Sequence, residues 1–125
     1  MQKIKKLPDA EFEIMKVVWA NEPPITTSLI MQKLGNEKEW LIQSVVTLMS
    51  RLVDRGFLRT EKAGKERFYY PTVERKAYLK FETGMFIKQY HENSFINLVN
   101  TLNEDKALSD KDIDDLFKWV QERKG

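Results

Sequence analysis

The sequence predicts a mainly α-helical chain with one small β-hairpin, and three observations lead to this fold class. Apolar residues recur at helical spacing through residues 9–20, 26–36 and 41–55. Between residues 57 and 71 the pattern becomes that of two β-strands separated by a glycine-containing turn. Helical spacing then returns in three segments from residue 74 onward.

Composition limits the classes of function. With 125 residues, of which 42% are hydrophobic, the chain can bury a core in one domain or two small ones. It has no cysteine and one histidine, His91, which disfavours disulfides, metal centres and Cys/His or Ser/His catalytic pairs. The acidic cluster of residues 110–115 lies at one helix start, where it complements the helix dipole. Because there is no long apolar run and no secretory signal, we expect a cytoplasmic protein that does not insert into a membrane. The residue types described above lead us to expect that it is not an enzyme and binds no cofactor or metal.

The first two predicted helices begin a helix-turn-helix. The first starts near Asp9 and ends before an Asn-Glu-Pro-Pro sequence, which cannot continue a helix. Its apolar residues lie on more than one side, so we expect it to be buried on more than one side. The second helix starts with Thr26 or Thr27 as N-cap and closes at residues 35–36. Trp40, just before the third helix, is predicted to fill the angle between the second and third helices.

The third predicted helix, residues 41–55, is amphipathic. Val45, Leu48 and Leu52 fall at positions i, i+3 and i+7, and Leu41 lies one turn earlier. These four residues predict one packed side.

The opposite side of this helix has small polar groups at its start and cations toward its end. It consists of Gln43, Ser44, Val46, Thr47, Ser50, Arg51, Asp54 and Arg55. Hydroxyl and amide groups of this size can contact base edges, and arginine can contact a guanine or a phosphate, which suits a helix in the DNA major groove. Taken alone, the helix is explained equally well as a solvated face.

A β-hairpin directly after Gly56 would form a wing, residues 57–70, beside the third helix. Lys62, Lys65 and Arg67 surround its tip, and contact with DNA phosphate is favoured because they flank the outer face of that helix. Residues 1–72 hold 12 Lys and Arg against 9 Asp and Glu, a net charge of +3, whereas residues 73–125 hold 9 against 10, a net charge of −1. This asymmetry suggests that only the front part meets a polyanion.

Residues 73–125 are predicted to form a helical dimerisation domain that follows a winged helix-turn-helix DNA-binding domain, residues 1–72. Its three helices carry more apolar residues than one face can bury, and short helices of this kind need a partner. The residues predicted for dimerisation are Tyr78, Phe81, Phe86, Tyr90, Phe95, Leu98, Leu102, Leu116, Phe117 and Val120. The alternative, in which these helices fold back on the N-terminal core, leaves their surplus aromatic surface without an explanation. The third helix opens with a capping-box pattern at residues 109–112.

Several motifs resemble the penicillinase-repressor family of winged-helix transcriptional repressors, which includes BlaI, MecI and CopY. They are DAEFEIMKVVW from residue 9, the threonine-led second helix, W-x-x-x-S-V-x-T-L-x-x-R-L-V-x-x-G from residue 40, and FYYP at the end of the wing. The resemblance extends from about residue 7 to the end and is strongest over residues 9–71. It implies a bacterial homodimer that represses transcription from a palindromic operator in double-stranded DNA.

The resemblance also implies which residues contact DNA. They are Gln43, Ser44, Val46, Thr47 and Arg51 on the recognition helix, residues 41–55, and Lys62, Lys65 and Arg67 on the wing, residues 57–70. Many relatives carry Lys at the position of Gln43, and several carry Arg at the position of Val46. The resemblance therefore does not specify the operator sequence.

How repression is relieved is left open by the sequence. The copper-responsive branch of the family ends in cysteine pairs, which this chain lacks. In the β-lactam-responsive branch a sensor protease cuts the second C-terminal helix, which corresponds to residues 99–103 here, but the Asn-Phe junction of staphylococcal-type relatives is missing. A repressor gated by an antibiotic or a metal, and a winged-helix module that binds another protein through Trp40 and the hairpin, are the alternatives.

Overall fold

The computed structural model describes residues 4–125 and divides into two compact units, Met1–Glu82 and Thr83–Gly125. The boundary falls inside helix α5 (Arg75–His91), not after residue 72 as the sequence predicted. The physical reason is that the first turns of α5 pack against the core of unit 1 through Tyr78, which is fully buried.

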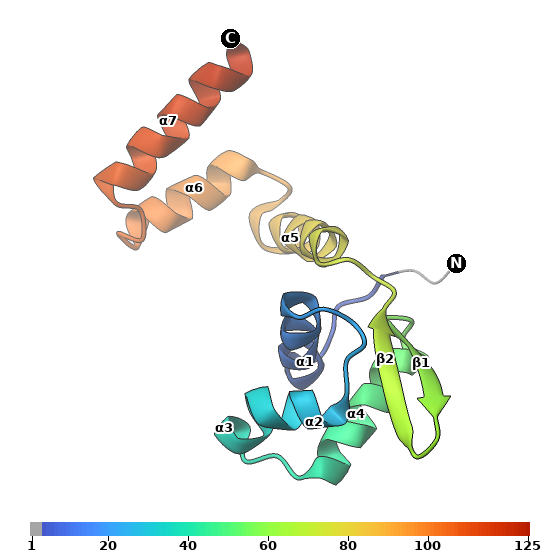
Figure 1. The fold of residues 1–125 in the computed structure, drawn as a ribbon. Helices are drawn as coiled ribbons and strands as arrows, with labels where there is room; N and C mark the ends of the chain where they lie inside the picture. Colours follow the sequence, from blue (N-terminus) through green and yellow to red (C-terminus); the bar gives the residue numbers. More distant parts are fainter. Residues whose placement is uncertain (1–3) are drawn as a thin grey trace. The chain divides into compact units, whose positions relative to one another are not determined.

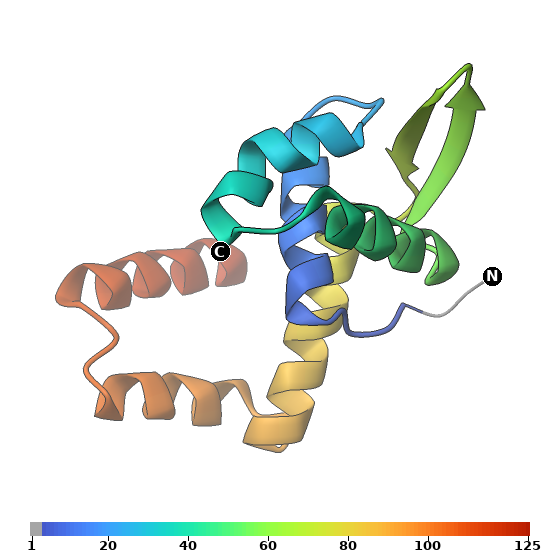
Figure 2. The same cartoon turned by 90° about the horizontal axis from the view of Figure 1, so that it is seen from below.

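Unit 1 is a helix-turn-helix followed by a hairpin. Helix α1 (Asp9–Ala20) precedes a helical run made of α2 (Thr27–Ile30), the π-helical η1 (Met31–Gly35) and α3 (Asn36–Lys38). Helix α4 (Ile42–Asp54) follows, and then strands β1 (Leu58–Ala63) and β2 (Glu66–Pro71) form an antiparallel pair. The hairpin lies beside the C-terminal part of α4 (Figures 1 and 2).

Local chemistry explains where most of these elements begin and end. The Thr26 hydroxyl accepts a hydrogen bond of 3.2 Å from the Leu29 N–H and so caps α2, one of the two N-caps that were predicted. Gly56 has φ of 82° after α4, and Gly64 has φ of 64° in the two-residue turn of the hairpin. Both backbone conformations favour glycine.

The second predicted helix does not close at residues 35–36. The chain continues as a helix through Gly35 to Lys38 and turns at Glu39, whose φ is 57°. Gly35 is buried, and a Cβ atom there would lie 2.7 Å from the sulfur of Met31. The end of the flexible Met31 side chain lies against Gly35, and because the helix continues past this glycine, the prediction that it ends the helix is wrong.

The core of unit 1 joins all of its elements except α3. Its buried apolar residues are Leu7, Ile14, Met15, Val18, Ile25, Ile30, Leu34, Val45, Met49, Leu52, Phe57, Leu58, Tyr69 and Tyr78. Two backbone hydrogen bonds of 2.9 Å between Ile25 and Tyr69 connect the segment before α2 to the wing. The wing is thereby fixed to the helices by backbone bonds as well as by side-chain packing.

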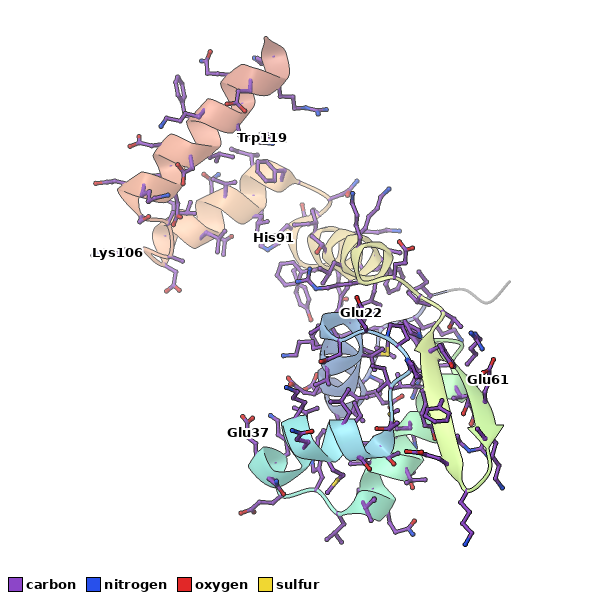
Figure 3. The ribbon with its side chains drawn as sticks, in the orientation of Figure 1. Glu22, Glu37, Glu61, His91, Lys106 and Trp119 are labelled. Carbon is purple, nitrogen blue, oxygen red and sulfur yellow. The ribbon has the colours of Figure 1, made fainter. Side chains whose placement is uncertain are left out.

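Unit 2 contains the second half of α5, helix α6 (Phe95–Glu104) and helix α7 (Asp110–Lys124). Ser94 caps α6, and Ser109 and Asp112 form the predicted capping box at the start of α7. Within residues 83–125 the only buried side chain is that of His91, whose Nδ1 lies 2.6 Å from the Asn97 Oδ1. Figure 3 labels His91 near the end of α5. Unit 2 on its own therefore has no apolar core.

Candidate nucleic-acid interface

Helix α4 is held by one apolar side. Val45, Met49 and Leu52, spaced i, i+4 and i+7, are fully buried. Leu48 was predicted for this side but is only partly buried, and Leu41 is 74% exposed. Leu41 is extended, with φ of −77° and ψ of 153°, so it precedes the helix and does not share its apolar side.

The predicted recognition residues of α4 all lie on its solvent-exposed side, and no described element covers them. They are Gln43, Ser44, Val46, Thr47 and Arg51. Four of them, all except Val46, line a shallow surface hollow together with Leu48. A continuous polar strip with a cation at one end is thus presented to solvent.

Thr47 has a defined hydrogen-bonding role on this strip. Its hydroxyl donates a 3.0 Å hydrogen bond to the backbone carbonyl of Gln43, one turn earlier. The hydroxyl proton is therefore engaged, and the oxygen lone pairs remain as acceptors. In this rotamer Thr47 can accept from the exocyclic amino group of adenine or cytosine.

The cations of the wing tip are presented toward the helices. Lys62 and Arg67 are paired across the hairpin. Because side chains alternate along a strand, both lie on the face that also carries Leu58 and Tyr69, which are buried against the helices. Lys65 occupies the turn itself, and all three cations are exposed.

On the opposite face of the wing, Arg59 interacts with two other residues of the hairpin. The guanidinium of Arg59 stacks on the Tyr70 ring, 4.1 Å from its centroid, and Nη1 lies 2.6 Å from a carboxylate oxygen of Glu61. Figure 3 shows Glu61 on the side of the hairpin turned away from the helices. By contrast, no salt bridge involves Lys62, Lys65 or Arg67 within the described part of the chain, so these cations can bind phosphate.

The two arginines near the end of α4 have different partners. Arg51 is exposed beside the hollow, whereas the Arg55 Nε lies 2.6 Å from the Glu11 Oε1. Glu11 is buried, although an acidic residue in the first turn of a helix ordinarily lies in solvent and complements the helix dipole. The signal that could have revealed it is spacing. Glu11, Ile14, Met15 and Val18 occupy positions i, i+3, i+4 and i+7, so the carboxylate continues the buried stripe of α1.

Trp40 is partly buried and packs against the core. Together with Asp9 and Phe12 of α1 and Lys38 of α3, it lines a second surface hollow. That Trp40 fills the angle between the second and third helices stays a prediction.

The structure separates the residues that were predicted for dimerisation. Tyr78 is fully buried in the core of unit 1 and Phe81 packs against that core, so Tyr78 has no surface to offer a second chain and its assignment is corrected. The remaining eight are exposed or partly exposed: Phe86, Tyr90, Phe95, Leu98, Leu102, Leu116, Phe117 and Val120.

Further exposed apolar side chains escaped the sequence prediction. Met85, Ile96, Ile113 and Trp119 are each at least 45% exposed in unit 2. Figure 3 labels Trp119 on α7. The signal was available, because each lies within three residues of a predicted dimerisation residue on the same helix.

Other kinds of site find little support. Over residues 4–125 no three His, Cys, Asp or Glu side chains are grouped as metal ligands would be. Among the same residues, none of the helices is both long enough and apolar enough to cross a membrane.

Comparison with known proteins identifies the family. The model of the penicillinase repressor family matches residues 7–122 of this chain. The chain belongs to the penicillinase repressor family. Relatives within the family include the penicillinase repressor of Bacillus licheniformis, which is 27% identical over 124 residues that make up 99% of this chain and 96% of the relative. The methicillin resistance regulatory protein MecI of Staphylococcus aureus (strain N315) is 29% identical over 115 residues, 91% of this chain and 92% of the relative.

Solved structures of a family member match the winged-helix fold. The DNA-binding domain of the repressor BlaI is similar with a TM-score of 0.54 and 32% identity, over 62% of this chain and 94% of that domain. The monomeric form of Bacillus licheniformis BlaI in complex with the blaP half-operator is similar with a TM-score of 0.51, at the same identity and coverage. This member of the penicillinase repressor family is therefore a winged-helix protein, as the sequence predicted.

Proposed function

We propose that this chain is a transcriptional repressor that binds a palindromic operator in double-stranded DNA as a homodimer. The observation that carries the proposal is the exposed polar strip of α4 with the wing cations beside it, in a fold that a relative uses in complex with a half-operator. Family membership supports repression in particular, because the relatives are repressors and resistance regulators.

In the proposed complex the strip of α4 enters the major groove. Gln43, Ser44 and Thr47 supply short hydrogen-bonding groups for base edges, Val46 can contact a thymine methyl group, and Arg51 can reach a guanine or a phosphate. The wing places Lys62, Lys65 and Arg67 against the adjacent phosphates. Base contacts would then discriminate among sequences, and phosphate contacts would set register and affinity.

A homodimer formed through unit 2 has two copies of the DNA-binding helix α4. Within residues 83–125 no apolar side chain is buried, and large ones such as Phe95, Phe117 and Trp119 are more than half exposed. A unit of this size cannot be stable while its apolar surface stays in water, and a second copy of the same surface is the simplest cover. A two-fold pair reads two half-sites separated by about one helical turn or a multiple of it.

Repression would follow from competition. A dimer bound over a promoter prevents polymerase from occupying the same DNA, and this requires a cytoplasmic location beside the chromosome. A sensor protease as a second partner stays a prediction. The segment that corresponds to its cleavage region, residues 99–103, is helical in α6 and would have to unwind to be cut.

The proposal is tested by selecting duplexes from a random-sequence pool with the wild-type chain and measuring affinity for the selected and for unselected duplexes. We expect a selected consensus with two-fold symmetry, and binding that weakens with salt by about 0.9 log units per log unit of salt for each neutralised phosphate. A chain that selects no sequence would instead support a protein-interaction module. Loss of operator binding on adding an antibiotic or a metal, with the chain intact, would indicate ligand gating.

A further inference from the structure

A partly buried ion pair connects the end of α4 to α1. The Arg55 Nε donates to the Glu11 Oε1 over 2.6 Å. The Glu11 side chain is 2% exposed and that of Arg55 is 39% exposed. The carboxylate is thus enclosed by protein, while the far side of the guanidinium reaches the surface.

Such an ion pair contributes little net stability to a fold. Removing a carboxylate from water carries a desolvation penalty, and apolar side chains of the same volume would stabilise the contact between α1 and α4 at least as well. What an ion pair adds is direction, because a guanidinium N–H must point at its acceptor. The apolar contacts of Val45, Met49 and Leu52 have no comparable directional requirement.

The position of the pair links it to DNA reading. Arg55 is the C-cap of α4, and its N–H donates a 2.9 Å hydrogen bond to the carbonyl of Arg51, one turn earlier. Arg51 and Thr47 precede Arg55 at four-residue intervals, so these three residues lie along one side of the helix. Fixing Arg55 against α1 therefore limits rotation of α4 about its own axis and sets where Thr47 and Arg51 point.

We propose that Glu11 and Arg55 are positioning residues that orient α4 for base discrimination. Neither needs to touch DNA. They hold the polar strip at the rotation in which its side chains meet base edges. This inference rests on the proposed function and adds to it the residues that determine how sharply the operator is distinguished.

The test uses the 125-residue chain with Glu11→Gln, Arg55→Gln and the double variant. Glu11→Gln keeps the side-chain volume and removes the negative charge with which the Arg55 guanidinium pairs, so it breaks the ion pair with the least disruption to folding. Glu13→Gln is the matched control, because Glu13 pairs with Lys16 over 3.0 Å within α1 and does not involve α4. The probes are a duplex selected by the wild-type chain and an unselected duplex of equal length, at a temperature at which circular dichroism shows every variant folded.

We expect each single variant to lower the ratio of affinities for selected and unselected duplex by about tenfold, the loss that follows from one misplaced base contact. Affinity for unselected duplex and the salt slope should stay at wild-type values, and so should every measurement on Glu13→Gln. The double variant should lose no more than either single variant, because both changes break one contact.

Two results would overturn the inference. If a variant keeps the wild-type ratio of affinities for selected and unselected duplex but has lower thermal stability, the ion pair has a structural role only. A retained ratio with a smaller salt slope in Arg55→Gln would make Arg55 a phosphate contact. If Arg55→Gln does not fold, Arg55→Lys keeps the charge but changes the geometry, and a wild-type ratio in that variant and in Glu11→Gln would equally contradict positioning. A wild-type chain that selects no sequence would instead refute the proposed function, before any variant is compared.

Discussion

The hydroxyl of Tyr78 accepts a 2.8 Å hydrogen bond from the backbone N–H of Leu7, although 71 positions of sequence separate them. The Tyr78 ring also lies within 6.2 Å, centroid to centroid, of the rings of Phe12, Trp19, Phe57 and Phe81. This contact ties the segment before α1 to the first turns of α5. The start of the last predicted domain thereby belongs to the core of the winged helix.

Replacing Tyr78 by Phe should therefore destabilise unit 1. The ring would be kept, but the buried Leu7 N–H would lose its acceptor, which costs about 1–3 kcal/mol of unfolding free energy. Chemical denaturation at neutral pH, followed by tryptophan fluorescence, measures this loss. Replacing Tyr70 by Phe is the control, because it keeps the ring on which Arg59 stacks, and it should leave the unfolding free energy unchanged.

The same residue predicts a dependence of stability on alkaline pH. Burial and, secondarily, the Glu82 carboxylate raise the pKa of Tyr78 to about 12 from its usual 10.0. Below the unfolded pKa both states keep the proton and the stabilisation is complete. As pH rises toward the folded pKa, the unfolded state loses its proton first and the unfolding free energy falls. Wild type should lose stability more steeply than Tyr78→Phe in this range, and parallel curves would contradict the assignment.

Arg51→Ala tests the cation of the α4 strip as a base reader. If Arg51 contacts a guanine, the change should cost about 1–3 kcal/mol on the selected duplex and relax discrimination at one position. Fluorescence anisotropy titrations on selected duplexes with single-base changes would measure both effects. Equal loss on selected and unselected DNA would mean that Arg51 contacts a phosphate instead.

Lys65→Ala tests the wing turn as a phosphate contact. Affinity should fall to a similar extent on every sequence, and the log-log salt slope should decrease by about 0.9, the value for one phosphate. Lys80→Ala, which removes an exposed cation from α5, is the control and should change neither quantity. An unchanged slope for Lys65→Ala would remove Lys65 from the interface.

Phe117→Ser tests the proposed dimer surface of α7. Burial of a phenylalanine contributes about 1.5–3 kcal/mol, and a two-fold interface contains two copies, so the dimer should be weakened by about 3–6 kcal/mol. Sedimentation equilibrium measures the shift toward monomer, and Lys118→Ser alters the neighbouring exposed residue as a control. A dimer of unchanged strength would place the interface elsewhere on the chain.

The local features of this protein follow from its sequence because they depend on neighbouring residues. Two helices begin at side-chain caps that bond to residues a few positions away, Thr26 and the Ser109 capping box. The end of α4 and the hairpin turn depend on the backbone conformation of single glycines, Gly56 and Gly64. The exposed polar strip of α4 was predictable for the same reason, since helical spacing alone separates it from the buried side. The exposed apolar faces of unit 2 also follow from spacing.

The tertiary structure decided which partner each ambiguous side chain has. By sequence Arg51 and Arg55 are equivalent cations, but only Arg55 lies within reach of the buried Glu11 carboxylate. By spacing Tyr78 resembles the other aromatics of the C-terminal helices, yet its ring completes the core of unit 1. Periodicity determines which side of a helix is apolar, whereas the contact made by that side depends on chain segments far away in sequence. For this protein the sequence alone therefore determined the winged helix and the exposed polar face of α4, and only the packing of α1 against α4 and α5 decided how that face is held.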